Sequence, residues 1–460
     1  MKLFIIFSPL LFLLPSCEGH KQNTVADTIA IQAAPPAKEN FPVGNVLQLH
    51  CKNDSTNRFA LYLPTGYDNK KEFPLLLFFD PHADGTLPLE KYKRIAEKYG
   101  VLLAGSNVSK NGMDFNTTGN LVNTLLADLQ NRLPVDSLQI FLCGFSGGAR
   151  VAGMIALNHT GIAGVIGCSA SLPGNSASLP FYYTGIAGLC DMNYLEMRTQ
   201  HQQMDSLKTP HAFLLFPGKH EWAPVQTMDD AFAFQFCRTD GSKKSAVNLS
   251  ESMLRQSNYL VKNGQMPAAA DLLHDAISSL EGLCNTEKLQ KKNDSLIGHP
   301  DFKRAMAVEN KILREENYFQ RQFASAISSE NMDWFEQFFK GIDTSLTSKK
   351  APVYFMRKRT WAYMSLVCYS YCNQAFQQGN LQVIGHYTDL YKRVDPQNSE
   401  WAYMKAKLAM MSSDRENALA ALETCAGLGF KDRARLEQEP AFKPLFTEKR
   451  FQEILKSVGK

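Results

Sequence analysis

The chain has 460 residues, of which 44% are hydrophobic and 20% are charged. This length exceeds what one hydrophobic core usually organises, so we expect two domains. The formal net charge is only +4, and no run of Lys and Arg is long enough to follow a phosphate backbone. Nucleic acid is therefore not an expected partner.

The N-terminus has the pattern of an exported protein. Lys2 precedes an apolar run over residues 3–14, which is typical of a secretory signal and too short for an ordinary membrane-spanning helix. Residues 14–17 read Leu-Pro-Ser-Cys and resemble a bacterial lipobox, whose Cys becomes the lipidated first residue. We expect a lipoprotein-type signal peptide at 1–16 and a lipid anchor on Cys17, which places the protein on a membrane of the bacterial envelope. The alternative is a plain cleaved signal with an incidental Cys.

Residues 17–44 are expected to form a flexible tether, because they hold prolines and polar residues without periodicity. Short apolar runs then alternate with amphipathic stretches over residues 45–242, which predicts an α/β domain with a mostly parallel sheet covered by helices on both faces. Two strands before the first helix predict an antiparallel start. The expected strands are 46–51, 59–63, 75–79, 101–104, 138–143, 164–168, 181–186 and 212–216, and the expected helices are 89–99, 121–132, 149–157 and 194–207.

Residues 243–460 change in character, because strand-like runs vanish and apolar residues recur at helical spacing. Several similar residues recur 34 residues apart, a period that is typical of tetratricopeptide helix pairs. The pairs are Cys372 with Ala406, Ile384 with Ala418 and Tyr391 with Cys425. We expect an all-α, tetratricopeptide-like domain that offers a surface to a protein partner, with a plain helical bundle as the alternative.

The ten cysteines are dispersed and mostly stand in apolar runs, which indicates buried hydrophobic residues and no disulfide framework. Cys368 and Cys372 lie one helical turn apart, but no second Cys or His pair accompanies them at zinc spacing. No phosphate-binding or dinucleotide-binding glycine motif is present either. We therefore expect neither a metal nor an organic cofactor.

Residues 144–148 read Gly-Phe-Ser-Gly-Gly and match the pattern G-x-S-x-G around Ser146. An apolar run fit for a buried strand precedes the motif, and a stretch able to form a helix follows it. A serine on such a tight turn adopts a strained backbone and needs small neighbours. The motif and the order of elements resemble an α/β-hydrolase, in which Ser146 is the nucleophile.

In that fold the remaining triad residues follow in the order Ser, acid, His. The resemblance implies a base after the last strand, where His220 stands, and an acid after the preceding strand, where Asp191 stands. Asp205 is the only other Asp between Ser146 and His220, but it lies in a helical stretch. We assign the triad to Ser146, Asp191 and His220, with Asp205 as the alternative acid.

Residues 61–68, followed by Phe73-Pro74 and the third strand, are similar to the opening of the esterase branch, near polyhydroxybutyrate depolymerases, feruloyl esterases and dienelactone-hydrolase-like proteins. The oxyanion hole is then expected to combine the N–H of Gly147 with one from the loop after the third strand. The resemblance implies His-Gly in this loop, whereas this chain has His82 followed by Ala83. The second donor stays open between His82 and Ala83.

The function that follows is a serine esterase that hydrolyses a small-molecule or polysaccharide-linked carboxylic ester through an acyl-enzyme. Two alternatives stay open. The first is a serine peptidase with the same triad, although the chain lacks a propeller-sized companion domain. The second is a scaffold protein whose hydrolase-like domain is inert.

Overall fold

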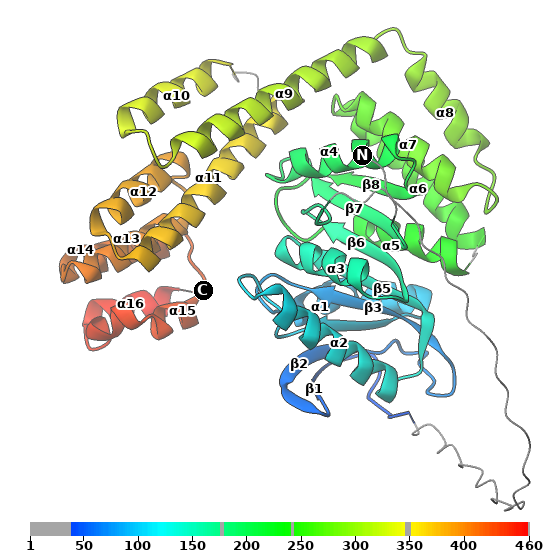
Figure 1. Ribbon diagram of the computed structural model, residues 1–460, viewed down its shortest axis with the longest axis horizontal. Coiled ribbons are helices and arrows are strands. Elements are labelled where there is room, and N and C mark those ends of the chain that lie inside the picture. Colours follow the sequence, from blue (N-terminus) through cyan, green and yellow to red (C-terminus); the bar gives the residue numbers. More distant parts are fainter. Residues whose placement is uncertain (1–37, 175–178, 241–242, 346–350, 459–460) are drawn as a thin grey trace, which may run out of the picture. The chain divides into compact units, whose positions relative to one another are not determined.

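The computed structural model describes residues 38–174, 179–240, 243–345 and 351–458 (Figure 1). The predicted signal peptide, Cys17 and most of the predicted tether lie outside these residues. Among the described helices, none is long and apolar enough to cross a membrane.

An eight-stranded sheet organises the first half of the chain, and each strand overlaps a predicted one. The strands are β1 Val46–Cys51, β2 Asp54–Tyr62, β3 Phe73–Phe79, β4 Leu102–Ser106, β5 Val135–Phe145, β6 Ile162–Cys168, β7 Tyr182–Gly188 and β8 His211–Phe216. They lie in the order β1-β2-β4-β3-β5-β6-β7-β8. Strand β2 runs antiparallel to both of its neighbours, and the pairs from β4 to β8 are parallel. The predicted antiparallel start and parallel remainder are confirmed.

Helices cover both faces of the sheet. Alternate side chains of the central strands point to opposite faces and enter two different cores. In β3, Leu76 and Phe78 pack with α1 and α5, whereas Leu75 and Leu77 pack with α2 and α3. The helices of this half are α1 Thr86–Tyr99, α2 Phe115–Arg132, α3 Gly147–Asn158, α4 Tyr194–Ser206 and α5 Val225–Asp240. The first four were predicted, and α5 was not.

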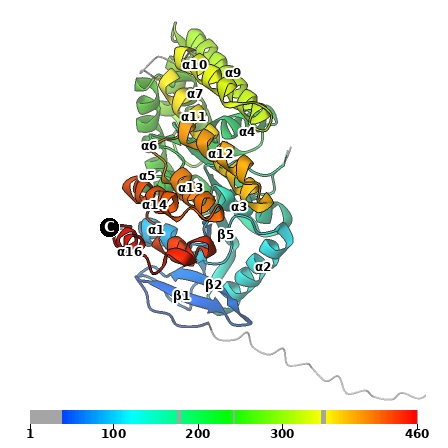
Figure 2. The same cartoon turned by 90° about the vertical axis from the view of Figure 1, so that its left-hand side faces the viewer.

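The second half is helical, as predicted. Its elements are α6 Lys243–Lys262, α7 Met266–Leu280, α8 Glu287–Ile297, α9 Phe302–Ala326, α10 Met332–Ser345, α11 Val353–Gln378, α12 Leu381–Val394, α13 Ser399–Met411, α14 Arg415–Gly427, α15 Arg433–Gln438, the 3₁₀ helix η1 Pro440–Leu445 and α16 Lys449–Ser457. Helices α11 to α14 lie next to one another in chain order, each in contact with the next (Figure 2). The residue pairs that are 34 positions apart fall on α11 with α13 and on α12 with α14, and all six side chains are buried. The tetratricopeptide assignment stays a prediction.

The core of the sheet continues into the first helices of the second half. Leu249 of α6, Leu273 of α7 and Leu289 of α8 belong to the same buried cluster as Phe213 of β8. Strand β8 is the last strand of the sheet, and its Phe213 N–H donates to the carboxylate of Asp275 of α7 at 3.0 Å. Helix α7 thus covers an edge whose backbone groups would otherwise stay unpaired. The domain boundary at residue 242 stays a prediction.

Candidate active site

Ser146 lies on the sharp turn between β5 and α3. Its backbone angles are φ 53° and ψ −119°, which an L-residue adopts only under strain. The Ser146 N–H donates to the carbonyl of Cys168 at the end of β6 at 2.8 Å, and this bond helps to hold the turn. A strained serine on a sharp turn between a central strand and a helix is the arrangement known as a nucleophile elbow.

The small neighbours of Ser146 are required by close backbone contacts. A Cβ on Gly144 would lie 2.1 Å from the carbonyl oxygen of Gly148, and a Cβ on Gly148 would lie 2.0 Å from the carbonyl oxygen of Phe79. Real Cβ atoms do not approach backbone atoms so closely. The two glycines therefore allow α3 to begin directly against β3 and β5.

The three residues predicted for the triad come together. His220 Nε2 lies 2.9 Å from Ser146 Oγ, and His220 Nδ1 lies 2.9 Å from Asp191 Oδ1. Asp191 follows β7 and is fully buried, whereas His220 follows β8 and its side chain is 19% exposed. Because β5, β7 and β8 are parallel, their carboxyl ends meet at one edge of the sheet, and residues far apart in sequence reach each other there.

Backbone contacts fix the loop that holds the acid. Asp191 Oδ1 also accepts a hydrogen bond from the Asn193 N–H at 2.9 Å. The Cys190 N–H donates to the carbonyl of Gly218 at 2.9 Å, so the loop after β7 is bonded to the loop that leads to His220. The carboxylate is therefore oriented before any substrate arrives, as a triad acid needs to be.

The structure brings Asp191, and not Asp205, to His220. The Asp205 carboxylate lies on α4, 3.7 Å from Nε2 of His211, and belongs to a different group of side chains.

The predicted oxyanion residues lie on two segments. Gly147 opens α3, so its N–H is one of those without an acceptor inside the helix. In the loop after β3, the His82 N–H donates to Asp80 Oδ1 at 2.8 Å, and the Ala83 N–H donates to the Asp80 carbonyl at 3.2 Å. Ala83 has φ 61°, a conformation that favours glycine, which is the residue that the resemblance implies here. The second donor stays open between His82 and Ala83.

Sequence reasoning missed three polar side chains around this loop. Trp222 Nε1–H donates to Asp80 Oδ2 at 2.9 Å, and both residues are buried. This bond ties the loop after β3 to the segment just beyond His220. Asn111 lies so close to Gly147 that a Cβ there would be 1.7 Å from the Asn111 Oδ1. The sequence could have pointed to two of them by their positions, since Asp80 directly follows a strand and Trp222 stands two residues after His220.

The helical half also contacts the loop after β7 that carries Asp191. Arg359 of α11 donates from Nη1 to the carbonyl of Leu189 at 3.0 Å, two residues before Asp191. The same guanidinium donates from Nε to Glu316 of α9 at 2.8 Å, and both side chains of this pair are buried. The charge pair therefore connects two helices of the second half to the loop after β7.

The cysteines of the described residues are buried or half-buried, and none of them forms a disulfide bond. Cys368 and Cys372 are fully buried in the core of the helical half, and burial raises the pKa of the Cys372 thiol to about 12. These two thiols are core residues, as predicted.

A mostly parallel sheet in this strand order, with a strained serine after β5 and acid and histidine after β7 and β8, defines the α/β-hydrolase fold. No family model matches the sequence, and no curated protein matches it.

Several solved structures are similar in fold. A hyperthermophilic esterase from the archaeon Pyrobaculum calidifontis is 11% identical, and the match covers 41% of this chain and 81% of that one with a TM-score of 0.34. For S-formylglutathione hydrolase from Staphylococcus aureus the identity is 15%, the coverage is 42% and 95%, and the TM-score is 0.36. For the feruloyl esterase module from Clostridium thermocellum these values are 13%, 42% and 85%, and 0.33.

Proposed function

We propose that this protein is a serine hydrolase that cleaves carboxylic esters with Ser146 as nucleophile. The observation that supports this proposal most is the unbroken path of two 2.9 Å contacts from Ser146 through His220 to the buried Asp191. A serine hydroxyl is a weak nucleophile by itself, and an adjacent base oriented by a third group activates it. The strained turn presents the hydroxyl outward, as acyl transfer requires.

The reaction proceeds in two steps. Ser146 Oγ attacks the ester carbonyl while His220 Nε2 takes its proton, and Asp191 stabilises the imidazolium that forms. The tetrahedral intermediate collapses to an acyl-enzyme as His220 returns the proton to the leaving alcohol. Water then attacks the acyl-enzyme with the same histidine as base, which releases the acid and restores Ser146.

Negative charge develops on the carbonyl oxygen in both steps. We assign its stabilisation to the N–H of Gly147, aided by the positive end of α3, and to one N–H from His82 or Ala83. In this proposal either loop N–H reaches the oxyanion only after a small shift away from Asp80, which accepts both bonds. The two steps use only protein groups and water.

A fluorophosphonate probe tests this function, because it reacts only with an activated serine. The wild-type chain is expected to be labelled and to hydrolyse p-nitrophenyl esters of short acids, and Ser146→Ala is expected to lose both properties. Ser137→Ala is the matched control, since Ser137 is exposed on the same strand β5. A folded wild-type chain that is neither labelled nor active would favour an inert domain on a scaffold. Faster cleavage of peptides than of esters would favour the peptidase. A screen over short acyl, feruloyl and acetylated-sugar esters then defines the substrate.

We also propose that the protein acts in the bacterial envelope as a lipoprotein anchored through Cys17, with the helical half open to a protein partner. The support is the lipobox-like sequence, which lies outside the described residues. Cys17→Ser is expected to move the protein from the membrane fraction to the soluble fraction. Unchanged membrane association would contradict the anchor.

A further inference from the structure

A second group of chemically versatile side chains lies away from the triad, where α4, β8 and α7 meet. It consists of His201 and Asp205 on one face of α4, His211 at the start of β8 and Asp275 on α7. Each residue offers one nitrogen or oxygen atom, and these four atoms all lie within 4.8 Å of one another. His201 Nδ1 is 2.7 Å from His211 Nε2 and 4.0 Å from Asp275 Oδ2, and His211 Nε2 is 3.7 Å from Asp205 Oδ1.

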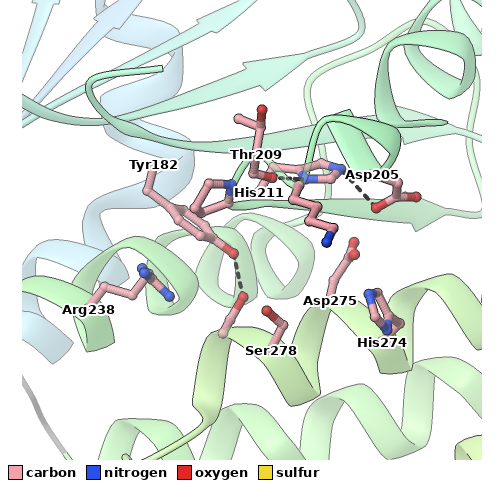
Figure 3. Close-up of a pocket in the computed structure, with 11 residues that line it drawn as sticks. Tyr182, Asp205, Thr209, His211, Arg238, His274, Asp275 and Ser278 are labelled. Carbon is pink, nitrogen blue, oxygen red and sulfur yellow. Dashed lines mark hydrogen bonds and ion pairs between the residues drawn. The ribbon is translucent and has the colours of Figure 1, made fainter. Parts of the chain in front are cut away.

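The group lies at the wall of a pocket of about 410 Å³. The side chains of His201, His211 and Asp275 are buried, whereas that of Asp205 is 37% exposed. Figure 3 shows His211 and Asp205 facing each other, with Asp275 approaching from α7. The site therefore has a buried floor and one side that is open to solvent, through which an ion can enter.

The hydrogen bonds orient one imidazole as a metal ligand. His211 Nδ1 lies 2.8 Å from the carbonyl of Thr209, which accepts only, so this nitrogen carries the proton (Figure 3). His211 Nε2 is consequently left with a lone pair that points into the group. A histidine that donates one ring N–H to a carbonyl and offers the other nitrogen inward has the arrangement of a metal-bound imidazole.

One buried nitrogen of the group lacks a hydrogen bond within the part of the chain that the structure describes. His201 Nε2 is buried and has no hydrogen-bond partner among the described residues. Asp275 is buried and accepts one hydrogen bond from the Phe213 N–H at 3.0 Å, whereas Arg198 already pairs with Asp271 and Glu309. A divalent cation would balance both carboxylates.

We propose that these four residues form a binding site for Zn²⁺, with His201 Nδ1, His211 Nε2, one oxygen of Asp205 and one oxygen of Asp275 as ligands. Mixed imidazole and carboxylate ligands suit zinc better than Mg²⁺ or Ca²⁺, which take oxygen. Zinc bonds of about 2.0–2.2 Å in a tetrahedron separate the ligand atoms by roughly 3.4 Å. The separations in the group bracket this value, so small side-chain rotations complete the site.

The ion would also satisfy the unpaired nitrogen. When His201 binds through Nδ1, its proton moves to Nε2, which lies 3.5 Å from the second carboxylate oxygen of Asp205. Four protein ligands leave no open position, which indicates a structural role. Because Asp275 belongs to α7 and the other three ligands belong to the hydrolase half, the ion would fasten the helical half to the edge of the sheet.

Metal content and thermal unfolding test the site, and neither depends on ester hydrolysis. The full chain is treated with a chelator, dialysed against Zn²⁺ and then against buffer. One Zn²⁺ per chain is expected, with a higher Tm than the chelated protein. Asp205→Asn and His211→Gln are each expected to weaken Zn²⁺ binding by at least ten- to a hundredfold, the loss that even a supporting contact of a metal ligand causes. His274→Gln is the matched control, because His274 lines the same pocket outside the ligand set.

Three results would overturn the site. The first is a folded wild-type chain that retains no Zn²⁺. The second is a pair of variants that bind Zn²⁺ as the wild type does. The third is a His274→Gln control that loses the ion as completely as they do. If His211→Gln does not fold, Asp205→Asn decides, because its side chain is partly exposed and its amide keeps the size of the carboxylate.

Discussion

Replacing Asp191 by Asn tests the triad most directly, because it removes one charge and preserves the shape of the side chain. In the proposed reaction His220 becomes an imidazolium whose Nδ1 lies 2.9 Å from Asp191 Oδ1. Two unit charges about 4 Å apart interact by about 4 kcal/mol at the effective dielectric constant of a protein. Each 1.36 kcal/mol changes a rate tenfold, so the loss of this attraction slows acylation by about a thousandfold.

The amide adds a second penalty. Asp191 Oδ2 is buried without a hydrogen-bond partner in the described part of the chain, so an amide N–H in its place has no acceptor there. Turning the amide over would instead point its N–H at His220 and favour the wrong imidazole tautomer. The same replacement lowers turnover by about ten-thousandfold in a well-studied triad, and we expect Asp191→Asn to lie between these two values.

The assay is kcat/KM for the best p-nitrophenyl ester, together with the rate of fluorophosphonate labelling, which depends on the same base. Circular dichroism and thermal unfolding verify the fold of each variant. Asp205→Asn alters the alternative acid and does not touch the contact between His220 and Asp191. Its kcat/KM should therefore stay far above that of Asp191→Asn. A folded Asp191→Asn that keeps more than a tenth of the wild-type kcat/KM would refute the assignment of the acid, and so would an Asp205→Asn that is the crippled variant.

Three further predictions concern stability and thiol chemistry. Gly148→Ala forces a Cβ to within 2.0 Å of the carbonyl oxygen at the end of β3 and should lower the free energy of unfolding by about 2 kcal/mol or more, whereas Gly66→Ala, with nothing within 4 Å, should be nearly neutral in urea titrations. Arg359→Met leaves the buried Glu316 unpaired and should cost about 3–5 kcal/mol, most of which the double variant with Glu316→Leu should recover; equal losses in both variants would contradict this account. Burial raises the pKa of Cys51 to about 11, so the native chain should resist alkylation of this thiol at pH 8 and the unfolded chain should not, as peptide mass spectrometry would show.

The sheet could be predicted because its strands are short apolar runs, separated by amphipathic stretches in which apolar residues recur at helical spacing. Helix α5 escaped prediction for the opposite reason. Residues 231–237 read Ala-Phe-Ala-Phe-Gln-Phe-Cys and are all buried, so this part of the helix has no exposed polar face to reveal its period. The apolar side chains of this part lie between the sheet and α6, and only the folded molecule shows that they are enclosed there.

The order of the three proposed triad residues could be predicted because each of them follows a recognisable strand. The contacts around it were not, since they join positions that are far apart in the sequence. Trp222 bonds to Asp80 across 142 residues, and Arg359 bonds to the Leu189 carbonyl across 170. The proposed zinc site has the same property. Its two residues on α4 are four positions apart and visible as a pair, but no spacing rule links them to a strand terminus and to a helix of the other half.

The helical half contacts the loop after β7 and strand β8, which lead to the proposed acid and base. Arg359 holds the carbonyl of Leu189, just before Asp191, and Asp275 accepts the N–H of Phe213 in β8, whose end leads to His220. Ser146 follows β5, near the middle of the sheet, and its turn is held by β6 instead. A partner that displaces α7 or α11 would therefore disturb the position of acid and base while the nucleophile elbow stays intact. Through these contacts, binding at the helical half would have a physical route to the rate of the proposed acyl transfer.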